Sequence, residues 1–205
     1  MDDGRFRTLH ALRVKGLTSP AVAAEIVSLS ESDAQARLTE LEAEGLVRHR
    51  GAGRVQGWTL TKEGKAAHAE LLADAVDADA RAALDAAYDG FLPVNGDFKE
   101  VCTAWQTRGD GTTPNDHTDA AYDAAVIERL AEVDARVDGV LRDLGGAVDR
   151  MAGYRPRLTD ALARVRDGDA TAFTAPMTAS YHDVWMELHQ DLIVSLGLTR
   201  GAADE

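Results

Sequence analysis

Residues 38–50 read LTELEAEGLVRHR, and residues 57–71 read GWTLTKEGKAAHAEL. The first passage starts with apolar residues at helical spacing and reaches Gly45, a residue type that helix C-termini favour. The following residues are typical of a strand, a glycine-punctuated loop and a returning strand, which predicts a β-hairpin over residues 46–60. Thr61 then predicts the N-cap of another helix. The two passages therefore predict a helix, a hairpin and a helix in direct succession.

Two more helices are expected before this stretch. A short amphipathic segment ends at Gly16, and Pro20 stands at a first-turn position of a second helix. Ser30 predicts the N-cap of a third helix over residues 31–44. The inner face of this third helix repeats at i, i+4 and i+7 and consists of Ala34, Leu38 and Leu41. Three helices followed by a hairpin is the plan of a winged helix-turn-helix.

The same passages resemble the MarR-like bacterial winged-helix regulators, which share an L…LE..GLV.R passage and a Y/W.LT..G passage. The resemblance covers roughly residues 5–75. It implies sequence-specific binding to double-stranded DNA, with the third helix in the major groove and the wing at 50–57 against the minor groove or the phosphates. The DNA-contacting residues expected from their positions are Ser32, Gln35, Ala36 and Arg37 on the third helix and Arg48, Arg50 and Arg54 around the wing.

The charge of the chain is unevenly distributed. The net charge is −13, yet residues 1–70 carry ten basic and ten acidic side chains, so the whole acidic excess lies in residues 71–205. The third helix has one cation, Arg37, and its carboxylates are Glu31, Asp33, Glu40, Glu42 and Glu44. Carboxylates repel phosphates, so we expect weak DNA binding that is very sensitive to salt. The alternative is a winged-helix scaffold that does not bind DNA and instead binds a protein partner or a small molecule.

Strand signals disappear beyond the hairpin. We expect two domains, a winged helix-turn-helix at 1–75 and an acidic all-α domain at 76–205, joined by one continuous helix near 62–90. Pro93 and Gly96 are expected to break the helical pattern. The predicted fold class is mainly α with one small β-hairpin, and the second domain is expected to be a helical bundle.

A long helix is expected over residues 118–144. Its apolar residues form a heptad seam of less than three repeats: Val126, Leu130, Val133, Val137, Val140 and Leu144. Such a seam needs a partner helix, from the same chain or from a second subunit, and so few repeats do not decide between them. We expect the acidic domain to form a homodimer, and the last helix, from Pro176 to Leu196, to be central.

Two segments, 113–123 and 180–189, are richer in polar and aromatic residues than packing requires. Together with the helix near 98–106, they could line a pocket for a small-molecule effector, with aromatic walls and a few polar contacts. The expected ligand-binding residues are Trp105, Gln106, His117, Tyr122, Tyr181, His182, Trp185 and His189. The alternative is that Asp116 or Thr118 simply caps the long helix.

A third hypothesis is a small enzyme that uses this His/Tyr/Trp cluster, but no catalytic motif has the required spacing. We therefore name no catalytic residue, cofactor or metal ligand. His182 and His189 are about 10.5 Å apart along one helix axis, so that one ion cannot take both. Asp183 and Glu187 are interpreted as solvated surface carboxylates, and Cys102 as a core residue on an apolar helix face.

Composition narrows the class of protein. A single cysteine leaves no disulfide framework and no multi-cysteine zinc site. No stretch approaches about 18 apolar residues, and the N-terminal residues have no apolar run after their charges, so we expect neither a membrane span nor a signal peptide. The expected location is the cytoplasm.

Overall fold

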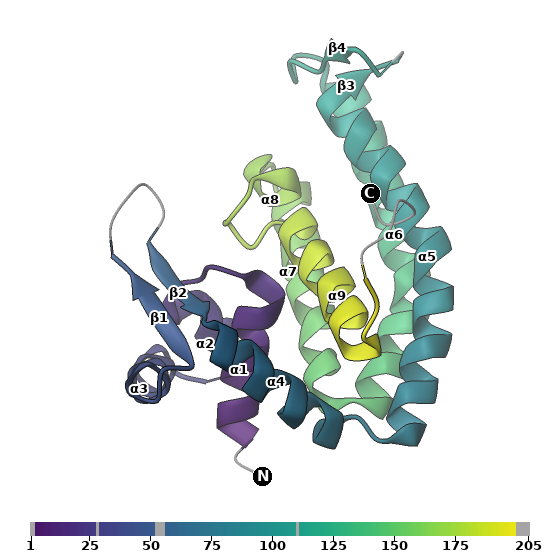
Figure 1. Cartoon of the computed structure of the whole chain (residues 1–205). Coiled ribbons are helices and arrows are strands. Elements are labelled where there is room, and N and C mark those ends of the chain that lie inside the picture. Colours follow the sequence, from purple (N-terminus) through teal and green to yellow (C-terminus); the bar gives the residue numbers. More distant parts are fainter. Residues whose placement is uncertain (1–2, 28, 52–55, 110, 200–205) are drawn as a thin grey trace. The chain divides into compact units, whose positions relative to one another are not determined.

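The structure is a computed structural model that describes residues 3–27, 29–51, 56–109 and 111–199. The chain is mainly helical and divides into two compact units (Figure 1). Unit 1 consists of residues 1–79 and 193–205, and unit 2 consists of residues 80–192. In the described part of the chain, no helix is both long and apolar enough to cross a membrane.

Unit 1 contains three helices, a hairpin and a fourth helix. In chain order these are α1 (Asp3–Lys15), α2 (Pro20–Val27), α3 (Glu31–Ala43), β1 (Val47–Arg50), β2 (Gly57–Leu60) and α4 (Lys62–Ala75). β1 and β2 pair antiparallel, with Val47 opposite Leu60, so the predicted hairpin is confirmed. Thr18 adds a backbone bridge to Trp58 that we did not predict, and the two N–H groups donate to each other's carbonyl oxygens at 3.0 and 2.8 Å.

The helix signals of α3 and α4 lie where the sequence predicts them. Ser30 Oγ accepts the N–H of Asp33 at 3.1 Å, and Thr61 Oγ1 accepts the N–H of Gly64 at 3.0 Å. Each cap satisfies a backbone N–H that the first helical turn leaves without a partner. Gly45, just after α3, has a φ of 77°, the left-handed conformation that favours glycine.

The core of unit 1 is formed by apolar faces of its helices and of the hairpin. Its main buried residues are Leu9, Leu12, Ala23, Leu38, Leu41, Val47, Trp58 and Leu60. Ala34, Leu38 and Leu41 are each at most 1% exposed, so the inner face predicted for α3 is confirmed. α3 is therefore held in unit 1 through this one face.

The start of α4 lies directly against the backbone that joins α3 to β1. Thr61 Oγ1 donates to the carbonyl oxygen of Gly45 at 2.7 Å, and the Thr61 N–H donates to that of Leu46 at 3.0 Å. A Cβ added to Gly64 would lie 1.9 Å from the same Leu46 carbonyl oxygen. Only glycine allows this close approach of a helix to a backbone.

We expect Gly64→Ala to destabilise the protein, because the new methyl group overlaps the Leu46 carbonyl group. Overpacking of this kind costs about 1–3 kcal/mol. Gly139→Ala is the matched control, since Gly139 is exposed within a helix of unit 2 and a Cβ there would meet nothing within 4 Å. The control should gain about 1 kcal/mol from helix propensity. Urea unfolding measures both free energies, and equal values for the two variants would contradict the packing described.

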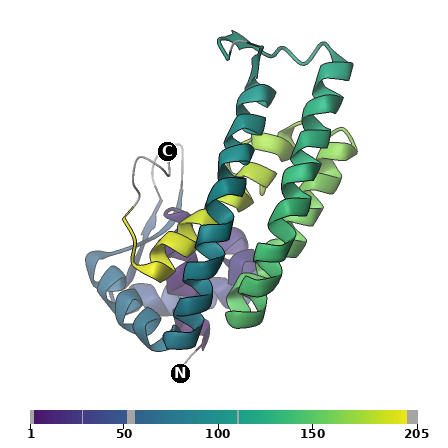
Figure 2. The same cartoon turned by 90° about the vertical axis from the view of Figure 1, so that its right-hand side faces the viewer.

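Unit 2 is built from long helices. The remaining elements are α5 (Ala78–Gln106), β3 (Thr107–Arg108), β4 (Thr113–Pro114), α6 (Ala120–Ala147), the 3-10 helix η1 (Asp149–Gly153), α7 (Tyr154–Arg166), α8 (Thr171–Thr174) and α9 (Tyr181–Leu196). α5 and α6 lie side by side as an antiparallel pair joined at one end by the short β3–β4 pair (Figures 1 and 2). The β3–β4 pair was not predicted.

Two helix boundaries differ from those that we predicted. The continuous helix expected near 62–90 is wrong, because α4 stops before Val76, which has extended backbone, and α5 begins at Ala78. The break expected at Pro93 and Gly96 is also wrong, because α5 continues through both of these exposed residues. A proline removes one helical hydrogen bond. The buried side chains of Phe91 and Val94 on either side keep the helix packed and offset that loss.

The heptad seam predicted for α6 is correct at all of its positions except one. Its buried residues are Val126, Leu130, Val133, Val137, Leu141 and Leu144. The seam thus moves from Val140 to Leu141, because a straight helix of 3.6 residues per turn drifts away from a strict seven-residue repeat. Within the same chain, α6 packs against α7 and η1, so the seam has an intramolecular partner.

α9 is buried around most of its circumference, as expected for a central helix. Tyr181, Val184, Trp185 and Leu188 are fully buried. The start predicted at Pro176 is wrong, because α9 begins at Tyr181. Met177 and Ala179 have φ of 60° and 50°, which is incompatible with continued right-handed helix.

Candidate functional site

The exposed side of α3 carries the residues expected to contact DNA. At 3.6 residues per turn, the side opposite the buried face is formed by Ser32, Ala36, Thr39 and Ala43, and all four are exposed. Gln35 is exposed at the edge of this side, and its amide donates to Thr39 Oγ1 at 3.2 Å. Arg37 lies on the other flank, where it forms an ion pair with Glu40 at 3.0 Å.

Four of the five carboxylates predicted on the third helix contact other groups of unit 1. Besides the Glu40 pair with Arg37, Glu42 accepts the backbone N–H of His49 at 2.9 Å, and Glu44 pairs with Arg5 at 2.6 Å. Asp33, at the helix start, accepts the hydroxyl of Ser30 at 2.6 Å. The acidic character of α3 is therefore concentrated on its flanks and largely engaged in local contacts.

The hairpin presents two cations on one side. Arg48 and Arg50 are exposed and alternate along β1, which places both on the same face of the strand. Neither forms an ion pair with any residue that the structure describes. His49 lies on the opposite face, with its ring 5.0 Å from that of Trp58. Arg54 lies outside the described residues.

The residues expected to bind a ligand in unit 2 form two groups. Tyr181 and Trp185 have no exposed surface, and Trp185 stacks on Phe98 at 4.4 Å and donates to Asn95 Oδ1 at 2.9 Å. His189 is also buried, with its ring 5.2 Å from that of Phe91. These three residues are packed core side chains. A ligand would need to displace them to enter.

His182 and Gln106 stand at the margins of this arrangement. His182 is half-buried beside Phe98, and this burial lowers the pKa of its imidazole, with a smaller opposing effect from Asp183. Gln106 is exposed at the end of α5. His182 therefore contacts the edge of the aromatic core group through Phe98, whereas Gln106 lies outside it.

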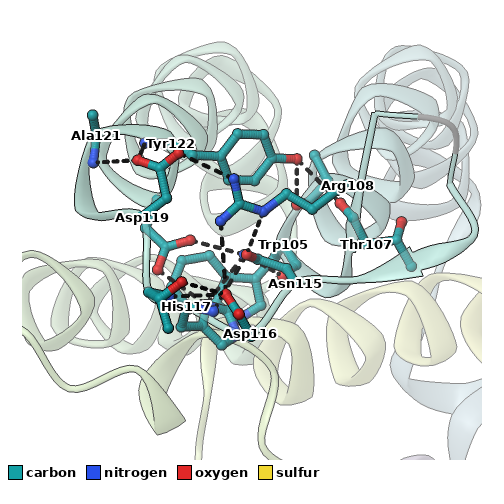
Figure 3. Close-up of polar contacts among 12 residues, drawn as sticks. Trp105, Thr107, Arg108, Asn115, Asp116, His117, Asp119, Ala121 and Tyr122 are labelled. Atoms are coloured by element: carbon teal, nitrogen blue, oxygen red, sulfur yellow. Dashed lines mark hydrogen bonds and ion pairs between the residues drawn. The ribbon is translucent and has the colours of Figure 1, made fainter.

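The second group lies at the end of α5, where Trp105, His117 and Tyr122 come together around two polar residues (Figure 3). The His117 ring lies 4.5 Å from that of Trp105. Arg108 covers the ring of Tyr122, with its guanidinium carbon 4.4 Å from the ring centroid. Tyr122 in turn donates its hydroxyl to the carbonyl oxygen of Ala104 at 2.9 Å.

Asn115 is the centre of the polar network in Figure 3. Its amide donates to the Trp105 carbonyl oxygen at 3.1 Å and to Asp123 Oδ1 at 2.8 Å, while its Oδ1 accepts Arg108 Nε at 2.9 Å. Arg108 also pairs with Asp119 at 3.1 Å. One buried amide thus ties the end of α5, the β3–β4 segment and the start of α6 together.

The N-cap of α6 is Asp119, so the assignment of the cap to Asp116 or Thr118 is wrong. Asp119 Oδ1 accepts the N–H groups of Ala121 and Tyr122, each at 3.1 Å. The Tyr122 hydrogen bond, followed by Arg108, lowers the pKa of the Asp119 carboxyl group. Asp116 instead closes a local turn onto Thr118.

His117 and Asp123 form an oriented histidine–carboxylate pair. Nδ1 of His117 lies 3.0 Å from Asp123 Oδ2. Nδ1 of His117 also lies 3.2 Å from Nδ2 of Asn115, so the pair belongs to the polar network around that amide. His117 also has a φ of 57°, an uncommon conformation for a residue with a Cβ.

The sequence did not indicate the buried ion pairs between α9 and its neighbours. Glu187 is 3% exposed and pairs with Arg157 at 2.7 Å, so its assignment to the surface is wrong. Asp191 pairs with Arg150 at 3.2 Å and accepts the hydroxyl of Tyr154 at 3.0 Å. The partners are distant in sequence, and only the position of carboxylates on a helix that is apolar around a wide arc could have suggested them.

The described residues do not favour a nucleophilic cysteine or a metal site. Burial raises the pKa of the Cys102 thiol to about 12, so that this cysteine stays protonated and unreactive. Among the residues that the structure describes, no group of three or more His, Cys, Asp and Glu side chains could hold a metal ion.

We expect Asn115→Ala to lower the free energy of unfolding of unit 2 by about 2 kcal/mol, because it leaves buried partners without hydrogen bonds. The control is Asp116→Ala, at a fully exposed carboxylate whose contacts are confined to Thr118 and Arg108, and its effect should be smaller. Thermal unfolding compares the two. An Asn115→Ala variant as stable as the unaltered protein would show that the network does not hold the α5–α6 junction.

Comparisons with known proteins give no indication of the function. No protein-family model, curated protein or solved structure matches this chain.

Proposed function

We propose that the protein is a cytoplasmic transcriptional regulator that binds double-stranded DNA through a winged helix-turn-helix in unit 1. The order α1–α2–α3–β1–β2 supports this proposal, as does the packing of α2 against α3. The backbone bridge from Thr18 to β2 further supports it, because it extends the hairpin by a third segment next to the helices. The resemblance to MarR-like regulators over residues 5–75 points to the same function.

The observation that carries the proposal is the free outer face of α3. Ser32, Gln35 and Ala36 are exposed there, and their side chains are short enough to let the helix backbone approach a groove. A glutamine amide can pair with both major-groove positions of adenine, and small apolar groups contact the methyl group of thymine. In this account α3 enters the major groove with these residues toward the bases.

The phosphate contacts come from the hairpin. Arg48 and Arg50 share one exposed face of β1 and have no ion-pair partner among the described residues, so no internal pair must break when they meet a phosphate. Arg37 is different, because it must leave Glu40 first. Binding thus depends on few cations, which predicts modest affinity with a measurable salt dependence.

Unit 2 would then provide dimerisation and ligand sensing. A homodimer with two winged helices could bind two half-sites about one helical turn of DNA apart. An effector bound in unit 2 would change their spacing and so the affinity for the operator.

A second candidate function is a winged-helix scaffold that binds a basic protein partner. The observation that favours it is the position of the carboxylates, since the exposed Asp33 and Glu40 border the outer face of α3. Such a partner would need positively charged groups opposite these carboxylates, whereas the phosphates of DNA are negatively charged. The two functions are therefore distinguished by their response to the same substitutions.

Binding of the full chain to a duplex from its own promoter should be measured by fluorescence anisotropy between 50 and 200 mM salt. Replacing both Arg48 and Arg50 with glutamine should lower the slope of log K against log salt by about 2, and affinity at 100 mM by about tenfold. The matched control is Arg166→Gln, an exposed cation of α7 in unit 2.

The control variant should bind as the unaltered protein does. If the unaltered protein shows no salt-dependent binding, DNA recognition is wrong, and the scaffold function becomes the better account. Equal losses from Arg166→Gln and from the double variant would mean that binding reflects only general charge and not the hairpin.

A further inference from the structure

A pocket lies beside the α5–α6 junction, on a different side of α5 from the aromatic core. Its volume is about 450 Å³. The lining residues that matter chemically are Lys99, Glu100, Thr103, Thr107, Tyr122 and Arg129. Of the ligand-binding residues predicted from the sequence, only Tyr122 is among the residues lining it. The volume is at the small end of ligand sites, which suits a metabolite and not a large effector.

Helical spacing explains why these side chains meet. Lys99 and Thr103 are four residues apart on one face of α5, and Thr107, the first residue of β3, continues this row with its hydroxyl group on the Thr103 carbonyl oxygen. Tyr122 and Arg129 are seven residues apart and share a face of α6. Because α5 and α6 lie side by side in both views, the two rows border the same hollow (Figures 1 and 2).

The pocket has an excess of positive charge in an otherwise acidic chain. Lys99 and Arg129 form no ion pair with any described residue, and among the described residues of the lining Glu100 is the single carboxylate. Arg108 also borders the pocket, but its charge is already balanced by Asp119. Within the described part of the lining, Lys99, Arg129 and Glu100 together leave one net positive charge that a ligand can neutralise.

The hydroxyl groups of Thr103 and Thr107 indicate which polar groups the rest of the ligand would carry. Thr103 donates its hydroxyl hydrogen to the Lys99 carbonyl oxygen at 3.0 Å, and Thr107 donates to that of Thr103 at 2.8 Å. With their hydrogens engaged, both oxygens face a ligand as acceptors. Glu100 is an acceptor as well. The pocket therefore offers donors for an anionic group and acceptors for hydroxyl groups.

We propose that this pocket binds a small phosphorylated polyol or sugar, with Lys99 and Arg129 holding the phosphate group and Thr103, Thr107 and Glu100 accepting hydrogen bonds from its hydroxyl groups. A phosphate group supplies the negative charge that the two cations need, in charge-assisted hydrogen bonds. The site does not depend on DNA binding by unit 1. If unit 1 does bind DNA, this pocket is where an effector acts.

The test is isothermal titration calorimetry of the full chain, without DNA, with glycerol 3-phosphate and glucose 6-phosphate as probes and glucose as the neutral match. At least one phosphorylated probe should bind with a Kd below about 10 mM, and glucose should not. Lys99→Gln and Arg129→Gln should each weaken binding by about tenfold, the loss expected for one charge-assisted contact. Arg166→Gln should bind as the unaltered protein does.

Circular dichroism melting checks that the variants remain folded, which is expected because the replaced side chains make no ion pair in the described structure. Failure of both phosphorylated probes to bind would overturn the proposal. Equal binding by the Lys99→Gln and Arg129→Gln variants and the unaltered protein would overturn it as well. Since no DNA is present, neither result depends on whether unit 1 recognises an operator.

Discussion

The functional account depends on the burial of three residues of α3. Ala34, Leu38 and Leu41 lie in the core of unit 1, and together they fix both the position and the rotation of the helix. Rotation is the important quantity, because it decides which side chains reach solvent. With these residues inside, Ser32 and Ala36 point outward, and the carboxylates fall on the flanks. A helix rotated by half a turn would bury its polar side and present leucines to a partner.

Local signals in unit 1 were sufficient to predict its first three helices, the hairpin and the start of α4, since the caps at Ser30 and Thr61 and the hairpin all depend on neighbouring residues. In unit 2, prediction failed where tertiary packing overrides local preference. Pro93 remains inside α5 because the surrounding face is buried. Glu187 is buried because Arg157, distant in sequence, neutralises it. Neither effect can be inferred from residue types within one helical turn.

The two sides of α5 explain why the candidate ligand residues were only partly grouped as expected. One side carries Phe91 and Phe98, which pack with Trp185 into a buried core. The other side carries Lys99 and Thr103 and borders the pocket. The prediction of a ligand site from aromatic and histidine residues selected side chains that pack on the first side. The second side consists of common surface residues, and it becomes a candidate site only when α6 adds Tyr122 and Arg129.

The central claim is that α3 recognises a DNA sequence, and selection of duplexes from a random pool tests it most directly. The account predicts that the unaltered chain enriches a defined sequence at 50 mM salt. It also predicts that Gln35→Ala relaxes the preference at one base-pair position, by about 1–3 kcal/mol for a lost bidentate contact. Enrichment of no sequence, or of the same sequence with unchanged preference by Gln35→Ala, would contradict base recognition by this face of α3.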